Sequence, residues 1–277
     1  MLGAIWSTVF YEPIMNSLLF LYGLFGENLG FAIIALTIIL RIILFPLMNS
    51  QFESSRKLRQ LQPMMENLKK KYERNPQKLQ QEQIALYRKV GYNPLGCLFS
   101  TLLPFPILIA IYQAITAFSK GTEITGVYQF VANFLNADGA IKIKTMFFGF
   151  DLSQAYRPIA SDVGYLSLKA LPYLLVVIVV VLSQYFASKF QQNLMGVSSD
   201  AEKKKKEDAK KKKNGTGGKS DMSSMMGDMS KSMQYTFPIM IGIISLDLPA
   251  AVSLYWILQS WLPVWLYELY NKLKNRE

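Results

Sequence analysis

"TIILRIILFPL", residues 37–47, places an arginine between two runs of three aliphatic residues. It lies in an apolar segment, Gly30–Met48, in which Arg41 is the only charged residue. As an α-helix, these 19 residues would cover about 28 Å, close to the thickness of the hydrocarbon core of a bilayer. A charge at the centre of such a helix costs about 2.5–3.5 kcal/mol on insertion scales, so the position of Arg41 calls for an explanation.

The rest of the chain has the same membrane pattern. Its 277 residues are 51% hydrophobic with a mean hydropathy of +0.18, and long apolar runs are separated by basic polar stretches. This pattern predicts an all-α polytopic membrane protein. The lack of histidine and the single Cys97 exclude a histidine-based catalytic triad, a histidine-ligated metal and an intrachain disulfide. Cys97 borders an apolar run, which is typical of a small packed residue, and lipidation is the alternative.

The apolar runs predict a five-transmembrane-helix bundle with a cytoplasmic helical hairpin and an interfacial N-terminal helix. The N-terminal apolar stretch from Pro13 is too short to span, which favours a helix lying on the bilayer. The alternative is that residues 2–22 span the membrane with Glu12 at mid-depth. The predicted segments are the interfacial helix 1–28, span one 29–49, the coiled-coil hairpin 50–92, span two 93–119, an extracytoplasmic loop 120–169, span three 170–188, a Lys/Gly/Met-rich loop 189–232, span four 233–247, span five 250–268 and a short tail 269–277.

The distribution of charge predicts the orientation. Residues 50–92 hold ten Lys and Arg against four acids, and residues 189–231 hold eleven against six. Basic loops stay on the cytoplasmic side, which puts the N-terminus outside and the C-terminus in the cytoplasm. The first basic residue is Arg41, so no ordinary signal peptide is expected, and a bacterial or archaeal cell membrane is the favoured location.

Residues 50–92 have the pattern of a helical hairpin. Apolar residues repeat at coiled-coil spacing, and the sequence RNPQ at 74–77 breaks the helix. The surface offers methionines and lysines to a substrate or a targeting partner, and a solvated coiled-coil arm is the alternative. The candidate recruitment residues are Met64, Met65, Lys69, Lys70 and Lys71. The lysine run 203–213 would attract ribosomal RNA or anionic lipid, or serve only orientation and solubility.

Three interpretations of Arg41 remain open at this point. Its guanidinium could snorkel to the headgroups, pair with Glu12 or Asp247, or face an aqueous cavity inside the bundle. Polar residues on the other spans favour the cavity, although each alone is typical of a hydrogen bond between helices. The glutamines among them are Gln113, Gln184, Gln234 and Gln259, and the serines are Ser183, Ser253 and Ser260.

Three segments carry a resemblance to a known family. They are "GFAIIALTIILRIILFPL" at 30–47, "LQPMMENLKKKYERNPQKLQQEQIALYRKVGYNPLGCL" at 61–98 and "FPIMIGIISLDLPAAVSLYWILQSW" at 237–261. Together with "FFGFDLS" at 147–153 they resemble the YidC/Oxa/Alb membrane protein insertases, over residues 13 to about 272 except the lysine-rich linker.

The resemblance implies a five-span core whose groove opens to the cytoplasm and sideways to lipid. Arg41 matches the family's groove arginine, and Gln184 and Trp256 match groove-lining positions. It implies no enzyme activity and no cofactor, and no GxxxxGK[ST] sequence is present. The implied partners are nascent membrane proteins, the ribosome and anionic lipid. The Sec translocon and the signal recognition particle or its receptor are further candidates. We expect the active form to be a monomer.

Two departures and two rival functions accompany this interpretation. Asp247 stands where the family commonly has an uncharged residue, and the tail after span five is too short for tail-based docking on the ribosome. A small channel or solute transporter is the first rival, although the sequence has none of the internal repeats that favour it. A factor that only helps membrane proteins to pack is the second, and the sequence does not separate it from an insertase.

Overall fold

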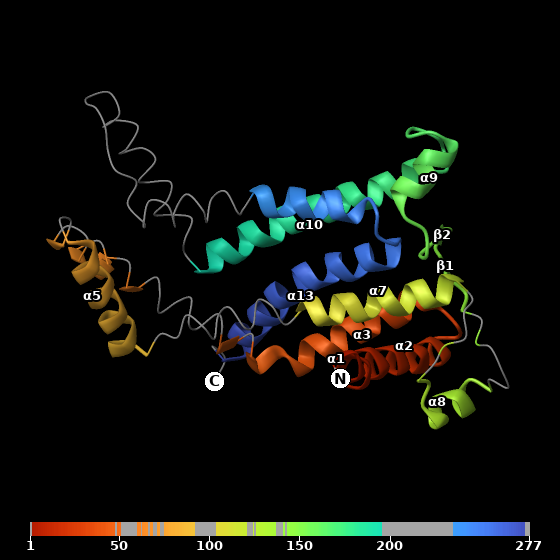
Figure 1. Ribbon diagram of the computed structural model, residues 1–277, viewed down its shortest axis with the longest axis horizontal. Helices are drawn as coiled ribbons and strands as arrows, with labels where there is room; N and C mark the ends of the chain where they lie inside the picture. The colour runs from red at the N-terminus through yellow and green to blue at the C-terminus, as the bar shows by residue number, and fades with distance from the viewer. Residues whose placement is uncertain are drawn as a thin grey trace. The chain divides into compact units, whose positions relative to one another are not determined.

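The computed structural model describes residues 2–47, 49–50, 60–61, 63–65, 67–68, 71–72, 75–91, 104–120, 124, 126–136, 141, 143–195 and 235–274 (Figure 1). The chain divides into two compact units. Unit 1 consists of Met1–Ile43, Leu103–Ala187 and Ser232–Glu277, and unit 2 of Leu44–Leu102 and Ser188–Lys231. The described residues are mostly helical, in agreement with the predicted all-α membrane protein.

Unit 1 begins with three helical pieces that follow one another without a break: α1 (Leu2–Trp6), the π-helical η1 (Ser7–Tyr11) and α2 (Glu12–Leu24). A turn with positive φ angles at Gly26 and Glu27 reverses the chain into α3 (Leu29–Ile43), which packs along α2 (Figure 1). The sequence favours an interfacial helix for this N-terminal segment. The structure packs η1 and α2 against α7 as well, and their position in the bilayer stays a prediction.

Four further helices come from the later apolar runs. They are α7 (Pro104–Lys120), α10 (Leu171–Met195), the helix Tyr235–Ser245 and α13 (Ala250–Lys274). They lie in unit 1 except for the end of α10, whose residues from Ser188 on belong to unit 2. Figure 1 shows α13 beside α3 and α7, with which it is in contact. In the described part of the chain, one helical stretch, Leu171–Phe190 of α10, is long and apolar enough to cross a membrane. The apolar helices Leu29–Ile43, Phe105–Phe118 and Tyr235–Ser245 are shorter.

The predicted loop 120–169 has structure of its own. It contains α8 (Gln129–Phe134), the two-stranded antiparallel hairpin β1 (Met146–Phe147) and β2 (Phe150–Asp151), and α9 (Tyr156–Val163). Phe148 and Gly149 both have positive φ, as the two central residues of a tight hairpin turn of the I′ type do. The ring of Phe147 occupies the space that a side chain at Gly30 would need, so β1 lies directly on the start of α3.

The start of α13 is held by this loop. The first backbone N–H groups of a helix lack partners inside the helix. Here the N–H of Ala250 donates to the carbonyl of Gln154 at 2.8 Å, and that of Ala251 donates to the carbonyl of Leu152 at 2.9 Å. The loop therefore serves as a backbone cap that fixes where α13 begins.

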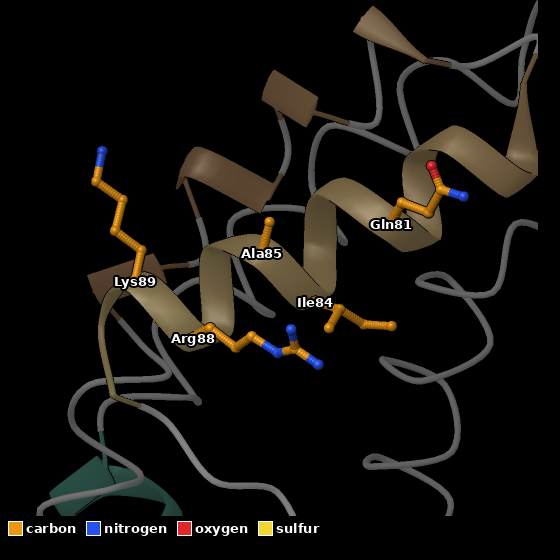
Figure 2. A pocket seen from close by; sticks show the side chains of 5 residues that line it. All are labelled: Gln81, Ile84, Ala85, Arg88 and Lys89. Atoms are coloured by element: carbon orange, nitrogen blue, oxygen red, sulfur yellow. The ribbon is translucent and has the colours of Figure 1, made fainter.

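Unit 2 contains α5 (Pro76–Lys89), which begins in the RNPQ sequence. The side chain of Asn75 accepts a hydrogen bond from the N–H of Lys78 at 3.1 Å, and Pro76 occupies the first turn, where its missing N–H costs nothing. One face of α5 lines a pocket (Figure 2), to which Gln81, Ile84, Ala85, Arg88 and Lys89 contribute. The described residues between 60 and 71 are also helical, and the pairing of the two helices as a hairpin stays a prediction.

Candidate functional site

Arg41 lies in the last turn of α3, where that helix packs against α13. Only 8% of the residue is exposed, and its Nη2 donates to the backbone carbonyl of Gln259 at 3.1 Å. One turn earlier, the buried hydroxyl of Thr37 donates to the carbonyl of Ile33 at 2.6 Å. The burial of Arg41 among protein atoms disfavours simple snorkelling, because a snorkelling side chain runs along a lipid-facing surface.

The two acids proposed as partners of Arg41 are bound elsewhere. Asp247 forms an ion pair with Arg157 of α9, with Nη1 and Oδ2 2.7 Å apart. Oε1 of Glu12 accepts a hydrogen bond from the hydroxyl of Ser7 at 2.9 Å, across the π-helical turn. These contacts disfavour the ion-pair interpretation of Arg41, and the cavity interpretation stays a prediction.

Two aromatic residues of α13 lie close to this contact in the sequence. Tyr255, one turn before Gln259, is 2% exposed, and within the described residues its hydroxyl is buried without a hydrogen-bond partner. The neighbouring Trp256, a predicted groove residue, is also buried, and its carbonyl accepts a hydrogen bond from the hydroxyl of Ser260 at 2.7 Å. Tyr255 lies near Arg41, and its buried hydroxyl adds a polar group to this contact between α3 and α13.

Gln113 belongs to a different contact. Its side chain is exposed, and its Oε1 accepts a hydrogen bond from Nε1 of Trp6 in α1 at 3.0 Å. The ring of Trp6 stacks on that of Phe10 at a centroid distance of 5.3 Å. The structure therefore joins Gln113 to the N-terminal helical segment.

The polar residues on α10 and on the last two helices form bonds between helices. The hydroxyl of Ser183 accepts a hydrogen bond from Nε1 of Trp261 at 2.7 Å, and Ser245 and Ser253 pair at 2.8 Å. Gln184, next to Ser183, is half-buried. The predicted groove residue Gln234 lies outside the described residues.

Thr37 and Tyr255 are buried residues with polar groups that sequence reasoning missed, and the exposed Trp261 is a further residue that it missed. Thr37 precedes Arg41 by four residues, and Tyr255 precedes Gln259 by four. Residues four apart share a helix face, so this spacing was the signal that would have included both. Trp261 carried no such signal, because its role depends on the approach of α10 to α13.

The candidate recruitment residues lie in unit 2. Met64 is exposed, Met65 is half-buried, and the ammonium of Lys71 lies 5.4 Å from the ring centroid of Tyr72. Lys69 and Lys70 fall outside the described residues. Within the described ranges, no group of three or more Cys, Asp or Glu side chains is placed to hold a metal ion.

Comparison with known proteins agrees with the resemblance seen in the sequence. The family model described as "60Kd inner membrane protein" matches residues 20–276. The chain is 30% identical to membrane protein insertase YidC 2 of Bacillus anthracis, over 91% of this chain and 76% of that protein. It is 29% identical to membrane protein insertase MisCA of Bacillus subtilis, over 91% of this chain and 74% of that protein. It is 27% identical to membrane protein insertase YidC of Oceanobacillus iheyensis, over 97% of this chain and 84% of that protein. The chain therefore belongs to the 60Kd inner membrane protein family, the YidC/Oxa/Alb family of non-enzymatic membrane proteins.

Proposed function

We propose that the chain is a membrane protein insertase. It moves short polar segments of nascent membrane proteins through a hydrophilic groove and releases their apolar segments sideways into the bilayer. The observation that carries the proposal is Arg41, a buried cation at the contact of two apolar helices, bonded to the Gln259 carbonyl. The relatives named as insertases support the same activity.

The proposed groove lies within a bundle of five spans formed by α3, α7, α10, the helix Tyr235–Ser245 and α13. Arg41, Gln113, Gln184, Gln234, Trp256 and Gln259 remain its candidate residues. The buried hydroxyl of Tyr255 supports a wet interior, because a buried polar group without any partner costs about 1–3 kcal/mol and water removes that cost.

The physical task is to carry a short polar segment past an apolar barrier. Arg41 offers a positive charge inside the groove, where the effective dielectric is lower than in water and attraction to an acidic N-terminal tail is stronger. A membrane potential that is negative on the cytoplasmic side then drives the tail outward by about 2.3 kcal/mol per charge per 100 mV. The apolar segment of the client leaves into lipid, where burial of its surface is favourable. No covalent bond changes.

The cytoplasmic segments would recruit clients and partners. In the predicted orientation, the N-terminus is outside the cell, and residues 50–92 and the lysine-rich loop are in the cytoplasm. The Met and Lys side chains of residues 64–71 then offer a contact surface to the ribosome, the Sec translocon or the signal recognition particle and its receptor. The lysine run 203–213 attracts RNA or anionic lipid.

The test is insertion into liposomes that contain the purified protein. A single-span client with an acidic N-terminal tail is translated beside empty liposomes and liposomes with wild type, Arg41→Ala or Arg41→Lys. Insertion is read as protection of the tail from protease. The matched control is Arg157→Ala, which removes an arginine that is half exposed and outside the proposed groove.

We expect wild type, Arg41→Lys and Arg157→Ala to insert the client well above empty liposomes, and Arg41→Ala to lose most of this gain. A second client with a neutral tail should depend less on Arg41. Insertion no better than in empty liposomes would overturn the proposed activity, and ion flux would then test the channel interpretation. Full insertion of the acidic client by Arg41→Ala would overturn the electrostatic mechanism while leaving the activity in place.

A further inference from the structure

The apolar surface of α10 continues beyond the first residue of the helix. Exposed apolar side chains recur at a spacing of three or four residues, so they share one face of the helix. This stripe consists of Leu168, Leu171, Leu175, Ile178, Leu182 and Phe186. Its first member precedes α10, which begins at Leu171.

Hydrogen bonds show why Leu168 lies in line with the helix. The hydroxyl of Ser167 accepts a bond from the N–H of Ala170 at 3.2 Å, and its carbonyl accepts one from the N–H of Leu171 at 2.9 Å. This is the arrangement of an N-cap residue, in which the side chain and carbonyl receive the first N–H groups of the helix. Leu168 is therefore placed in the first helical turn, on the stripe.

The tip Tyr165–Leu168 between α9 and α10 is held in place. The N–H of Gly164, with φ 97°, donates to the carbonyl of Ala160 at 3.0 Å, and the hydroxyl of Tyr156 donates to the carbonyl of Tyr165 at 3.0 Å. Leu166 is nevertheless 81% exposed and Leu168 is 90% exposed. An ordered segment thus presents large apolar side chains outward, which soluble surfaces rarely do over a continuous area.

We propose that the tip Tyr165–Leu168 is inserted in the bilayer leaflet that borders α9, the outer leaflet in the predicted orientation. Its partner is lipid, because its surface is continuous with the apolar face of the one described helix that is long enough to cross a membrane.

The length of α10 fits this placement. The 20 residues from Leu168 to Ala187 cover about 30 Å, the thickness of the hydrocarbon core. With the core starting at Leu168, Lys169 reaches the headgroups with its long side chain and Tyr165 lies at the interface, where tyrosine is enriched. The inference requires only that α10 spans the membrane and does not depend on insertase activity.

The experiment labels single cysteines with a fluorophore whose emission shifts to the blue in apolar surroundings. Cys97→Ser provides the background, since the chain has one cysteine. The test variants are Leu166→Cys and Leu168→Cys. Ile178→Cys, in the middle of the proposed span 168–187, marks the bilayer interior, and Asp162→Cys, exposed on α9, marks the aqueous side. The full chain is placed in vesicles of phosphatidylethanolamine and phosphatidylglycerol, with nitroxide quenchers on the lipid headgroup or on the acyl chain.

We expect labels at positions 166 and 168 to be blue-shifted relative to position 162 and strongly quenched by headgroup and shallow acyl-chain nitroxides. Position 178 should be quenched most by deep nitroxides. Emission at 166 and 168 like that at 162, with quenching by aqueous iodide, would overturn the proposal. A blue shift without quenching by any nitroxide lipid would also overturn it, because the tip would then contact protein. Both test residues are exposed, so a label there leaves packing undisturbed, and equal melting temperatures of the variants check this.

Discussion

Arg157 holds the turn before α13 at two points. Its Nη1 lies 2.7 Å from Oδ2 of Asp247, and its backbone N–H donates to the carbonyl of Leu246 at 2.8 Å. Asp247 is therefore the partner of a cation on α9. Both side chains are about half exposed, so water and salt weaken their attraction.

We expect Arg157→Ala and Asp247→Asn each to lower the free energy of unfolding by less than about 1 kcal/mol, because an exposed ion pair contributes little and the backbone bond remains. Thermal unfolding in detergent at low and high salt measures this. The difference from wild type should shrink in high salt. A larger loss that salt does not change would show that Arg157 acts through packing instead.

Asn16 should contribute more to stability than the ion pair of Arg157 and Asp247 does. It is 2% exposed, its Nδ2 donates to the carbonyls of Glu12 and Gly126, and its Oδ1 accepts from the N–H of Tyr128 at 2.7 Å. Asn16→Ala leaves the loop groups unpaired, and we expect a loss of about 1–3 kcal/mol in the free energy of unfolding. Ser17→Ala, at the exposed neighbouring position, is the control and should unfold like wild type.

An Asn16→Asp variant sharpens this test. Its carboxylate still accepts from Tyr128 but cannot donate to the two carbonyls, so we expect destabilisation at neutral pH. Wild-type stability of this variant would contradict the role given to the amide nitrogen.

The helix Tyr235–Ser245 approaches α10 closely at Gly242. A Cβ atom at Gly242 would overlap the side chain of Val181. We expect Gly242→Val to destabilise unit 1 by about 1–3 kcal/mol through overpacking. Adding Val181→Ala should restore part of the melting temperature, because it frees the space that the new side chain needs. If the double variant were less stable than Gly242→Val alone, this contact would not be the cause.

Asp151 makes the hairpin of β1 and β2 sensitive to acid. Burial opposes ionisation of its carboxyl, but hydrogen bonds from the side chain and backbone of Ser153, at 2.7 and 3.0 Å, and from Thr145 and Gln154 outweigh burial and lower the pKa below its ordinary 3.8. A carboxyl with a lowered folded-state pKa stabilises the fold above the unfolded-state pKa and loses this contribution as pH falls through the folded-state value.

We therefore expect wild type to lose stability as the pH is lowered through and below 3.8, and Asp151→Asn to lack that part of the loss. Melting temperatures across the acid range measure this difference. Ser153→Ala should bring the loss to a higher pH, because it removes one of the bonds that favour the carboxylate. Identical pH profiles of wild type and Asp151→Asn would contradict the assignment.

The sequence predicted the course of the helices better than their ends. The predicted span three stops at residue 188 and span five at 268, whereas α10 extends to Met195 and α13 to Lys274. Hydropathy reports which residues suit lipid, and Gln and Lys continue a helix readily after the apolar part ends. Composition therefore marks the extent of the membrane, while hydrogen bonding decides where a helix stops.

The contacts of the candidate site residues could be foreseen from the sequence only in part, and the site itself stays a prediction. A lone charge in an apolar run is visible in the sequence, and so are glutamines that interrupt such runs. The bond between Arg41 and Gln259 joins residues 218 positions apart, and that of Gln113 to Trp6 depends on how the N-terminal segment packs. The strands β1 and β2 are two residues each, too short for an alternating pattern to be recognised.

The cap on α13 restricts which substitutions the chain tolerates. Proline is normally well accepted in the first turn of a helix, because its missing N–H has no partner there. At Ala250 and Ala251 the N–H groups are already bonded to the carbonyls of Gln154 and Leu152, so proline at either position would remove one of the two bonds that join this loop to the helix. The carbonyls themselves belong to the backbone, so the cap does not depend on the side chain of residue 154, whereas Leu152 is constrained by its own burial. The contact between the loop and α13 is therefore most sensitive to proline at Ala250 and Ala251, the residues that donate the hydrogen bonds.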